Sequence, residues 1–514
     1  MHEIESDEFK LAAETPQFWT RDTLRGVVER ALGRRLFIVV SNREPYIHQL
    51  DGEEIVCTRP VSGMVAALEP VVRVCGGSWV AHGSGTADRD VVDEQDCIAV
   101  PPDSPEYKLR RVWISKADED GYYYGFANQA LWPLCHIAYR RPVFEAKDWE
   151  AYRRVNRQFA GAVLEEARGL DAIVLIQDYH LALLSSLLRR TNPRMLIAQF
   201  WHIPWPNRET FRVCPWGGPI LTGLLGNDLL GFHIRHHCQN FLETVATSIE
   251  ARVDYERSAV TRAGHMTMVR PFPISLDIDA ITEQAMSEAT AARVRQLRQQ
   301  LGLTNQRVLL GVDRIDYTKG IPERLRAFDR LLQRHPEYIG KLRFLQIASP
   351  SRTRLRHYQA LAREIEALVE EINWKYAQPH WFPITYREGH HTTKELLAFY
   401  RLADVCVASS LHDGMNLVAK EYIAARSDGD GVLVLSRFTG SARELDQSLH
   451  INPYAADETA ATLHQALCMQ ETERRRRMAG LRKAVARNNI YRWAGKMVNE
   501  LGRIAARRHL ETAA

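Results

Sequence analysis

The chain has few cysteines, and their scarcity excludes several kinds of site. Its 514 residues include eight Cys without a C-x-x-C pair, so neither a zinc ribbon nor a dithiol redox motif is predicted. Scattered thiols in a chain of this length are typical of a reducing compartment, where their main role is packing. We therefore expect a cytoplasmic protein.

Long apolar runs and a strong excess of one charge are also missing. No apolar run approaches the length of a membrane span, and the N-terminal MHEIESDEFK lacks the apolar core of a secretory signal. The net charge is +4, from 67 basic and 63 acidic residues, which is too small to indicate binding to nucleic acid or to a membrane. The pairs His236-His237 and His390-His391 lack metal-ligand spacing, so we predict that they lie on the surface or in loops.

What the chain does contain is short apolar, β-branched runs that alternate with helical patterns. Continuous apolar runs indicate strands that are buried on both faces, as in parallel sheets. They form two series, at 36–40, 172–176, 195–200 and 229–232, and then at 308–312, 342–348, 405–408 and 432–435. Amphipathic helices are expected at 322–334 and 354–372. We therefore predict an α/β protein of two doubly wound, Rossmann-like domains that face a central cleft.

Changes in composition suggest the domain boundaries. Residues 1–34 are mixed and polar and form an N-terminal extension, in which Trp19 is a candidate anchor. Two prolines between Val269 and Ile274 indicate the interdomain crossing, so the first domain spans 35–272 and the second 273–485. The basic segment from Glu471 to Arg508 is predicted to be helical, with its run of four arginines on a solvated face. Its last part, 486–514, is expected to cross back to the first domain.

The most informative motif is Asp313-Arg-Ile-Asp-Tyr-Thr-Lys-Gly320, at the end of a predicted strand. It places two cations, Arg314 and Lys319, where the strand gives way to a helix, which in an open α/β sheet is the ligand crevice. A planar guanidinium and a compact ammonium together suit a diphosphate. The alternative is a strand end with two solvated cations.

A second motif, Leu411 to Glu421, follows the predicted strand 405–408. Gly414 permits a tight turn, and the backbone N–H groups of 414–417 would form an anion site at a helix start. Asp413 would repel an anion and suits a neutral polyol, while Glu421 could accept hydrogen bonds from a ribose diol. The alternative role for Asp413 is an ordinary helix N-cap.

Polar residues also follow the strands of the first series. The runs at these strand ends are Ser41-Asn42-Arg43, Asp178-Tyr179-His180 and His202-Ile203-Pro204. Because the carboxyl ends of parallel strands meet at one edge, these residues should face the ligand. Ser62-Gly63-Met64 could open the helix after the first strand. Residues 122–124 and 131–133 are predicted to form an aromatic-rich loop that suits either a sugar or a packed cluster.

Taken together, these motifs resemble those of the trehalose-6-phosphate synthases, retaining glycosyltransferases of the GT-B fold. The resemblance extends from about Phe37 to about Trp493. It is carried by six runs: Gly125–Pro133, Asp178–His180, His202–Pro204, Asp313–Gly320, Gln346–Arg352 and Asp413–Glu421. Several ordered motifs across two domains are far more specific than any one of them.

The resemblance implies a role for each candidate residue. The catalytic residues would be Asp178, His202, Arg314 and Lys319. The nucleotide-sugar donor would be bound by Gly63, Arg314, Lys319, Asp413, Gly414, Met415, Asn416, Leu417 and Glu421. The sugar-phosphate acceptor would be bound by Arg43, Tyr123, Trp132, Asp178 and Arg352. Neither a metal nor another cofactor is expected, since fixed cations and helix N–H groups would stabilise the leaving diphosphate.

Two further expectations concern the reaction. No carboxylate is clearly placed as a nucleophile, which favours front-face transfer, in which the leaving phosphate helps to remove the acceptor proton. The product would be α,α-trehalose 6-phosphate, made from nucleotide-activated glucose, with UDP-glucose favoured, and glucose 6-phosphate. No Asp-x-Asp-Gly-Thr phosphatase motif is present, so a separate phosphatase would act on this product. The sequence fixes neither the nucleotide base nor the number of subunits, and a homo-oligomer is compatible with it.

Three departures from the family pattern leave the acceptor open. The chain has Ser62 where the family usually has Gly, His82 where it usually has Trp, and Trp205 where it usually has Phe. The loop from Glu44 to Pro60 also looks long. The alternatives are therefore a synthase of glucosylglycerol phosphate or a related product, and a catalytically silent sugar-phosphate sensor. Arg43 and Arg352 still favour a phosphorylated acceptor, because two guanidinium groups match a phosphate well.

Overall fold

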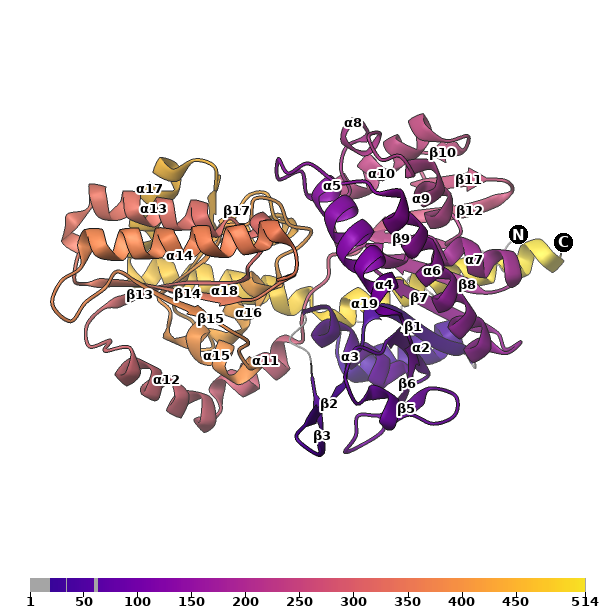
Figure 1. The fold of residues 1–514 in the computed structure, drawn as a ribbon, viewed down its shortest axis with the longest axis horizontal. Helices are drawn as coiled ribbons and strands as arrows, with labels where there is room; N and C mark the ends of the chain where they lie inside the picture. The colour runs from indigo at the N-terminus through magenta and orange to yellow at the C-terminus, as the bar shows by residue number, and fades with distance from the viewer. Residues whose placement is uncertain (1–18, 34, 60–62, 514) are drawn as a thin grey trace.

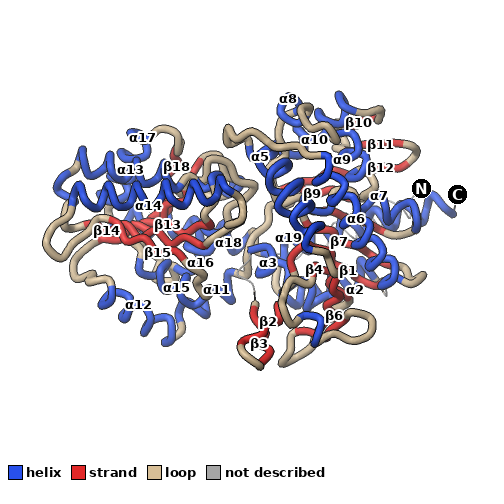
Figure 2. The backbone as a smooth tube through the Cα atoms, in the orientation of Figure 1, coloured by secondary structure: helices blue, strands red, loops and turns tan. Residues whose placement is uncertain are grey.

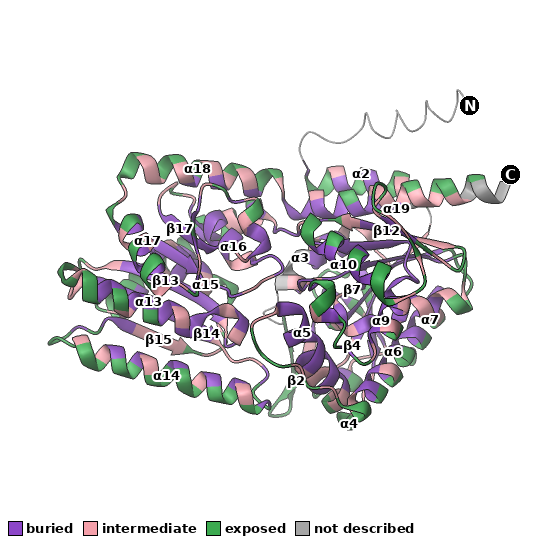
Figure 3. Cartoon of the chain, turned by 90° about the horizontal axis from the view of Figure 1, so that it is seen from above, coloured by how far each residue is buried: buried purple, intermediate pink, exposed green. Residues whose placement is uncertain are grey.

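Two mainly parallel sheets, one in each half of the chain, organise the fold into two lobes (Figure 1). The computed structural model describes residues 19–33, 35–59 and 63–513. Helices cover both faces of each sheet (Figure 2). The central strands of both sheets are buried while exposed residues lie on the outer helices (Figure 3), which explains why these strand sequences are continuously apolar. The predicted α/β class is confirmed.

The sheet of the N-terminal lobe has, within the described residues, the strand order β10-β11-β12-β9-β8-β7-β1-β4-β6-β5. Its strands are β1 (Leu36–Arg43), β4 (Ser78–His82), β5 (Cys97–Val100), β6 (Tyr107–Val112), β7 (Ala172–Gln177), β8 (Leu196–Phe200), β9 (Leu229–Phe232), β10 (Arg252–Asp254), β11 (Ala259–Arg262) and β12 (His265–Pro271). The strands from β12 to β6 are parallel, and β5, β10 and β11 are antiparallel. The strand order reverses between β7 and β1.

The sheet of the C-terminal lobe is entirely parallel, in the order β15-β14-β13-β16-β17-β18. Its strands are β13 (Arg307–Arg314), β14 (Leu342–Ser349), β15 (Ile384–Glu388), β16 (Val405–Ala408), β17 (Val432–Ser436) and β18 (Leu449–Ile451). The order reverses between β13 and β16. In open α/β sheets such reversal points are where ligands bind, and the two lobes face each other at these points.

The helices of the N-terminal lobe include the predicted aromatic-rich loop, which is in fact helical. They are α2 (Arg21–Leu32), α3 (Gly63–Cys75), α4 (Lys116–Glu119), η2 (Asp120–Leu131), α5 (Trp132–His136), α6 (Ala146–Ala167), α7 (Leu184–Thr191), α8 (Arg208–Phe211), α9 (Gly217–Leu224) and α10 (Arg235–Ser248). The loop prediction is wrong because η2, a π-helix, packs tightly on α6. A Cβ at Gly121 would lie 2.7 Å from the Cβ of Ala151, so this glycine allows the two helices to pack closely.

The helices of the C-terminal lobe cover both faces of its sheet. They are α11 (Ile278–Met286), α12 (Glu288–Gln300), α13 (Ile321–Arg334), α14 (Arg356–Tyr376), α15 (Thr393–Leu402), α16 (Leu417–Ala425), α17 (Ala456–Cys468) and α18 (Glu471–Arg487). The four arginines at 474–477 lie on α18 and form ion pairs with Asp430, Glu471 and Glu473. In the described part of the chain, no helix is both long and apolar enough to cross a membrane.

The last helix, α19 (Ile490–Ala513), returns to the N-terminal lobe (Figure 1). The predicted single helical segment is therefore two helices, which part at Asn488 and Asn489. The side chain of Asn489 donates to the carbonyl of Trp19 at 2.7 Å. Trp19 packs against Gly495 so closely that a Cβ there would overlap its ring. Helix α19 thus contacts α2 and α3 as part of the first lobe.

Two smaller predictions concern loops and histidines. The long loop between Glu44 and Pro60 contains an antiparallel hairpin of β2 (Ile47–Asp51) and β3 (Glu54–Thr58); Pro60 lies outside the described residues. His390 and His391 lie in a loop, as expected. The surface prediction is wrong for His237, which is 2% exposed, because its position on α10 turns it inward while His236 faces solvent.

Candidate active site

A cleft between the lobes collects nearly all of the predicted site residues. Its pocket has a volume of about 350 Å³ and opens at the carboxyl ends of β1, β7, β13 and β14. The predicted residues that line it are Arg43, Tyr123, Trp132, Asp178, His202, Arg314, Lys319, Arg352, Asp413, Met415, Asn416, Leu417 and Glu421. Gly63 begins α3 beside the lining residue Met64, and Gly414 stands in the chain between the lining residues Asp413 and Met415.

On the C-terminal wall, the two cations of the first motif differ in their partners. Lys319 forms an ion pair with Asp413, with Nζ and the carboxylate oxygen 2.5 Å apart. The guanidinium of Arg314 lies 5.6 Å from the ring centre of Trp132 and has no ion-pair partner within the described ranges. Gly320, at φ +63°, turns the chain between Lys319 and α13, where the carbonyl of Ser409 leaves no room for a side chain. Arg314 is therefore the cation that an anionic ligand meets uncompensated.

In the second motif, Leu411 to Glu421, the carboxylate of Asp413 contacts Lys319, and the first residue of helix α16 lines the cleft. The N-cap of α16 is Asn416, whose side chain accepts the N–H of Ala419 at 3.0 Å, so the alternative in which Asp413 is the N-cap is wrong. Burial raises the pKa of Asp413, but Lys319 outweighs burial and lowers it to about 2. Asp413 is therefore ionised at neutral pH.

The same loop brings the two lobes into contact. A Cβ at Gly414 would collide with the carbonyl of His202 and lie 2.9 Å from the ring of His233. Gly414 thus permits close approach of the backbone to the opposite lobe. Further along α16, Glu421 accepts a hydrogen bond from Tyr400 at 2.7 Å, and burial raises the pKa of this carboxyl.

On the N-terminal wall, Asp178 is held in an unusual backbone conformation. Its φ is +71°, a region that non-glycine residues occupy only when the surroundings enforce it. The carboxylate accepts the N–H of His202 at 3.2 Å. Burial nevertheless raises the pKa of Asp178 to about 7, against the effect of these backbone hydrogen bonds and of Arg352. Asp178 is therefore close to its midpoint of titration at neutral pH.

His202, beside Asp178, is a neutral imidazole. Its Nε2 lies 2.7 Å from Oε1 of Gln177, which fixes the ring, and because Gln177 can only accept at that oxygen, Nε2 carries the proton. Burial, and then His180, lower the pKa of His202 to about 3. The ring therefore carries no charge that would compete with the cations of the opposite wall.

Four of the predicted residues form one cationic and aromatic group that spans both lobes. The guanidinium of Arg352 lies 4.0 Å from the ring centre of Trp132 and forms a 2.6 Å ion pair with Asp316. Arg43 donates to the hydroxyl of Tyr123 at 3.5 Å. Burial alone would raise the pKa of Tyr123, but Arg43, Arg352 and Arg314 lower it to about 8. Such a concentration of positive charge fits a phosphate dianion.

Several buried polar atoms around the cleft have no partner in the protein. They are Asn42 Oδ1, Trp132 Nε1, Gln177 Nε2, His180 Nε2, His233 Nδ1 and Arg352 Nε. Buried donors and acceptors are nearly always satisfied in folded proteins. Their concentration around one pocket indicates a polar ligand that completes these hydrogen bonds.

Some lining residues were not among the predicted site residues. Asn42 and His180 belong to the strand-end runs that were expected to face the ligand, whereas His136, Gln177, His233 and Tyr400 were not singled out. Gln177 is the last residue of β7 and His233 follows the last residue of β9, so the rule that found Asp178 could also have found His233. His136 lies one helical turn after Trp132, which a helix prediction for that segment would have revealed. No signal in the sequence points to Tyr400.

The departures from the family pattern largely fall outside the cleft. Trp205 is fully buried and stacks on Phe211, with ring centres 4.7 Å apart. His82 ends β4 and does not line the pocket. Ser62 lies outside the described residues. Neither Trp205 nor His82 therefore changes the surface that an acceptor would meet.

Comparison with known proteins agrees with this geometry. The model of glycosyltransferase family 20 matches residues 35–503. Trehalose-6-phosphate synthase of Mycobacterium avium is 40% identical over 487 residues, which cover 93% of this chain and 97% of that protein. The corresponding enzyme of Mycobacterium tuberculosis is 38% identical over 473 residues, covering 90% and 94%.

Solved structures are similar over the same extent. The Escherichia coli protein bound to UDP-2-fluoro glucose superimposes with a TM-score of 0.81 at 33% identity, covering 91% of this chain and 98% of that one. The synthase of Burkholderia xenovorans in complex with glucose 6-phosphate gives a TM-score of 0.80 at 30% identity, covering 90% and 99%. These matches confirm the predicted GT-B fold. The chain belongs to glycosyltransferase family 20 and is a glycosyltransferase.

Proposed function

We propose that this enzyme transfers glucose from UDP-glucose to glucose 6-phosphate, with retention, to form α,α-trehalose 6-phosphate. The observation that carries the proposal is the cleft itself, in which a free cation at Arg314 faces a cationic and aromatic group built from Arg43, Trp132 and Arg352. The mycobacterial relatives are named trehalose-6-phosphate synthases, and one solved relative holds a UDP-glucose analogue and another glucose 6-phosphate.

The donor would lie on the C-terminal wall. Arg314 and Lys319 would bind the diphosphate, and the amides at the start of α16 would add their partial positive charge. Lys319 would keep its contact to Asp413, so the carboxylate could accept hydrogen bonds from the glucose while it holds the ammonium in place. Glu421 would accept hydrogen bonds from the ribose.

The acceptor would lie on the N-terminal wall, with its phosphate between Arg43, Tyr123 and Arg352. The pKa of Tyr123, lowered to about 8 by these cations, is itself a measure of how strongly the site favours negative charge. Asp178 and His202 would contact the hydroxyls near the reacting centre, where the neutral imidazole offers its unprotonated Nδ1 as an acceptor.

The chemistry we propose is front-face transfer without a metal ion. Most carboxylates of the cleft are engaged: Asp413 with Lys319, Asp313 with Arg324 and Glu421 with Tyr400. The departing phosphate oxygen would receive the acceptor proton, while fixed positive charge stabilises the leaving diphosphate. The enzyme would contribute positioning and electrostatics, as suits two substrates that are held by separate lobes.

A nucleotide-release assay tests the proposal. UDP-glucose is offered with glucose 6-phosphate, with glycerol 3-phosphate, and with no acceptor. We expect release with glucose 6-phosphate and product with an α,α linkage by NMR. Faster release with glycerol 3-phosphate would favour a glucosylglycerol-phosphate synthase, whereas no release with any acceptor or nucleotide base would favour the silent sensor.

The cellular setting is part of the same proposal. All eight cysteines are free thiols, which suits the reducing cytoplasm. A separate phosphatase would remove the phosphate from the product. We also propose that the enzyme can work as a homo-oligomer, which light scattering at working concentration would test.

A further inference from the structure

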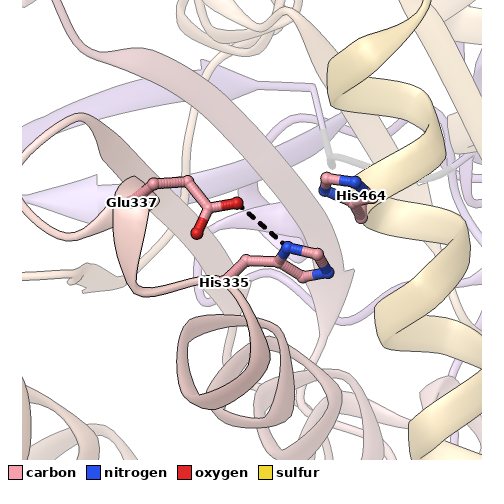
Figure 4. Close-up of side chains that lie close together, drawn as sticks. All are labelled: His335, Glu337 and His464. Atoms are coloured by element: carbon pink, nitrogen blue, oxygen red, sulfur yellow. Dashed lines mark hydrogen bonds and ion pairs between the residues drawn. The ribbon is translucent and has the colours of Figure 1, made fainter.

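Three potential metal ligands gather far from the cleft, at the outer end of the C-terminal lobe. His335 follows the last residue of α13, Glu337 lies in the short helix η5 (Pro336–Tyr338), and His464 lies on α17. One ligand atom from each lies within 4.8 Å of the other two. Figure 4 shows the carboxylate of Glu337 directed at the ring of His335, with the ring of His464 above it.

The distances within this group suit a common ion. Nδ1 of His335 and Oε1 of Glu337 are 3.0 Å apart. Two ligand atoms that each lie about 2.0–2.1 Å from a tetrahedral Zn²⁺ are separated by roughly 3.3 Å. Two imidazoles and one carboxylate, with a fourth position open to water, are a ligand set that Zn²⁺ commonly adopts.

The neighbours of His464 favour the same interpretation. The hydroxyl of Tyr338 lies 2.8 Å from Nδ1 of His464, an outer contact of the kind that orients a metal-bound imidazole. Cys468, one helical turn further along α17, has its sulfur 3.7 Å from Nε2 of His464. The thiol is exposed and could supply a fourth ligand.

We propose that His335, Glu337 and His464 bind one divalent transition-metal ion, and that Zn²⁺ fits this ligand set best. The two rings are stacked, with centres 3.7 Å apart and planes at 9°, so their in-plane lone pairs run parallel and one ring must turn to meet the ion. His335 can turn, because its side chain is 26% exposed and this torsion is soft. Because of this rearrangement, we expect binding to be weaker than at a preformed structural site.

Binding would tie the end of α13 to α17, which are 129 positions apart in the chain at His335 and His464. The 14 residues of α13 separate the site from Lys319 by about 20 Å. The ion would therefore stabilise the C-terminal lobe and take no part in glycosyl transfer.

Calorimetric titration of the chelator-stripped full-length protein with Zn²⁺ tests the inference. We expect one ion per chain and an unfolding midpoint that rises with Zn²⁺ concentration. Glu337→Gln, at a side chain that is 56% exposed, should weaken binding at least tenfold without affecting the fold, and His464→Gln should abolish it. The double variant H390Q/H391Q is the matched control and should bind as the parent does.

Spectroscopy of the Co²⁺ complex identifies the ligands. Intense visible bands would indicate a four-coordinate site. A thiolate charge-transfer band that is lost in Cys468→Ala would identify Cys468 as the fourth ligand. Binding that survives both Glu337→Gln and His464→Gln, or a midpoint that does not respond to Zn²⁺, would overturn the proposal and leave two stacked imidazoles as a packing contact.

Discussion

The two walls of the cleft differ in how they handle charge. On the C-terminal wall the aspartates are paired with cations, as Asp413 is with Lys319 and Asp316 with Arg352. On the N-terminal wall His202 is neutral and burial raises the pKa of Asp178 to about 7. The first wall thus keeps a fixed charge pattern, which suits a charged leaving group. The second wall can adjust its protonation to the hydroxyls of a sugar.

The largest effect should come from removing the unpaired cation of the C-terminal wall. Arg314→Ala leaves the charge that develops on the diphosphate uncompensated, so we expect turnover to fall about 10²–10³-fold, comparable to the loss of an oxyanion donor. Nucleotide release under saturating substrates measures it. Arg326→Ala removes an exposed cation on α13 that is paired with Glu364, and turnover should be unchanged. Turnover of Arg314→Ala within threefold of the parent would reject the assignment.

A smaller and more selective effect on kinetics is expected from Arg352, a residue of the C-terminal lobe that contacts Trp132 of the N-terminal wall. Arg352→Lys keeps the charge but loses the planar stack on Trp132 and the fork that binds a phosphate. We expect the KM for glucose 6-phosphate to rise roughly tenfold to a hundredfold, with the KM for the donor little changed. Steady-state kinetics with both substrates varied will separate these. The exposed Arg356→Lys is the control, and equal changes in both KM values would contradict an acceptor role.

Asp178 allows a test of stability rather than of rate. Its pKa is raised from 3.8 to about 7, so the folded protein holds a proton that the unfolded chain has already lost. Stability therefore falls as pH rises from about 4 to about 7, and the cost of the buried charge is fully present above pH 7.

Asp178→Asn removes this cost and keeps a residue that tolerates a positive φ. We expect it to be more stable by about 1–3 kcal/mol at pH 8, with a smaller gain at pH 5. Denaturant unfolding at the two pH values measures the difference, and Asp171→Asn, at an exposed position, is the control. A gain that is the same at both pH values would show that Asp178 is not buried as a charge.

The smallest effect concerns metal ions. Because fixed cations line the C-terminal wall, turnover at 25 °C should be unchanged by excess chelator, as initial rates will show. A loss of rate that Mg²⁺ restores would mean that the cations of the C-terminal wall do not stabilise the leaving diphosphate without a metal ion.

The sequence predicted strands whose apolar runs are uninterrupted and missed several strands that carry charged side chains. Residues 229–232 and 405–408 match β9 and β16 because their apolar runs are uninterrupted. β6 and β15 carry arginines within them, so no apolar run marks them. The break between α18 and α19 was missed because Asn489, which lies there, contacts Trp19, 470 positions away in the chain.

The site residues were found for a similar reason. Residues at strand ends, such as Asp178 and Arg314, are placed by topology and can be predicted from it. The pairing of Lys319 with Asp413 and the stacking of Arg352 on Trp132 depend on how segments from different parts of the chain meet. Neither contact can be predicted from the residues that neighbour it in the sequence, and the same holds for the buried position of His237.

The return of α19 to the first lobe has a consequence for synthesis of the protein. Trp493, Met497 and Leu501 belong to the same apolar core as Trp19 and Val39. While the ribosome is still making the second lobe, the first therefore lacks part of its interior and exposes the groove between α2 and α3. The first lobe, although translated first, is completed last, and a chain truncated before α19 should depend on chaperones even if its second lobe has folded.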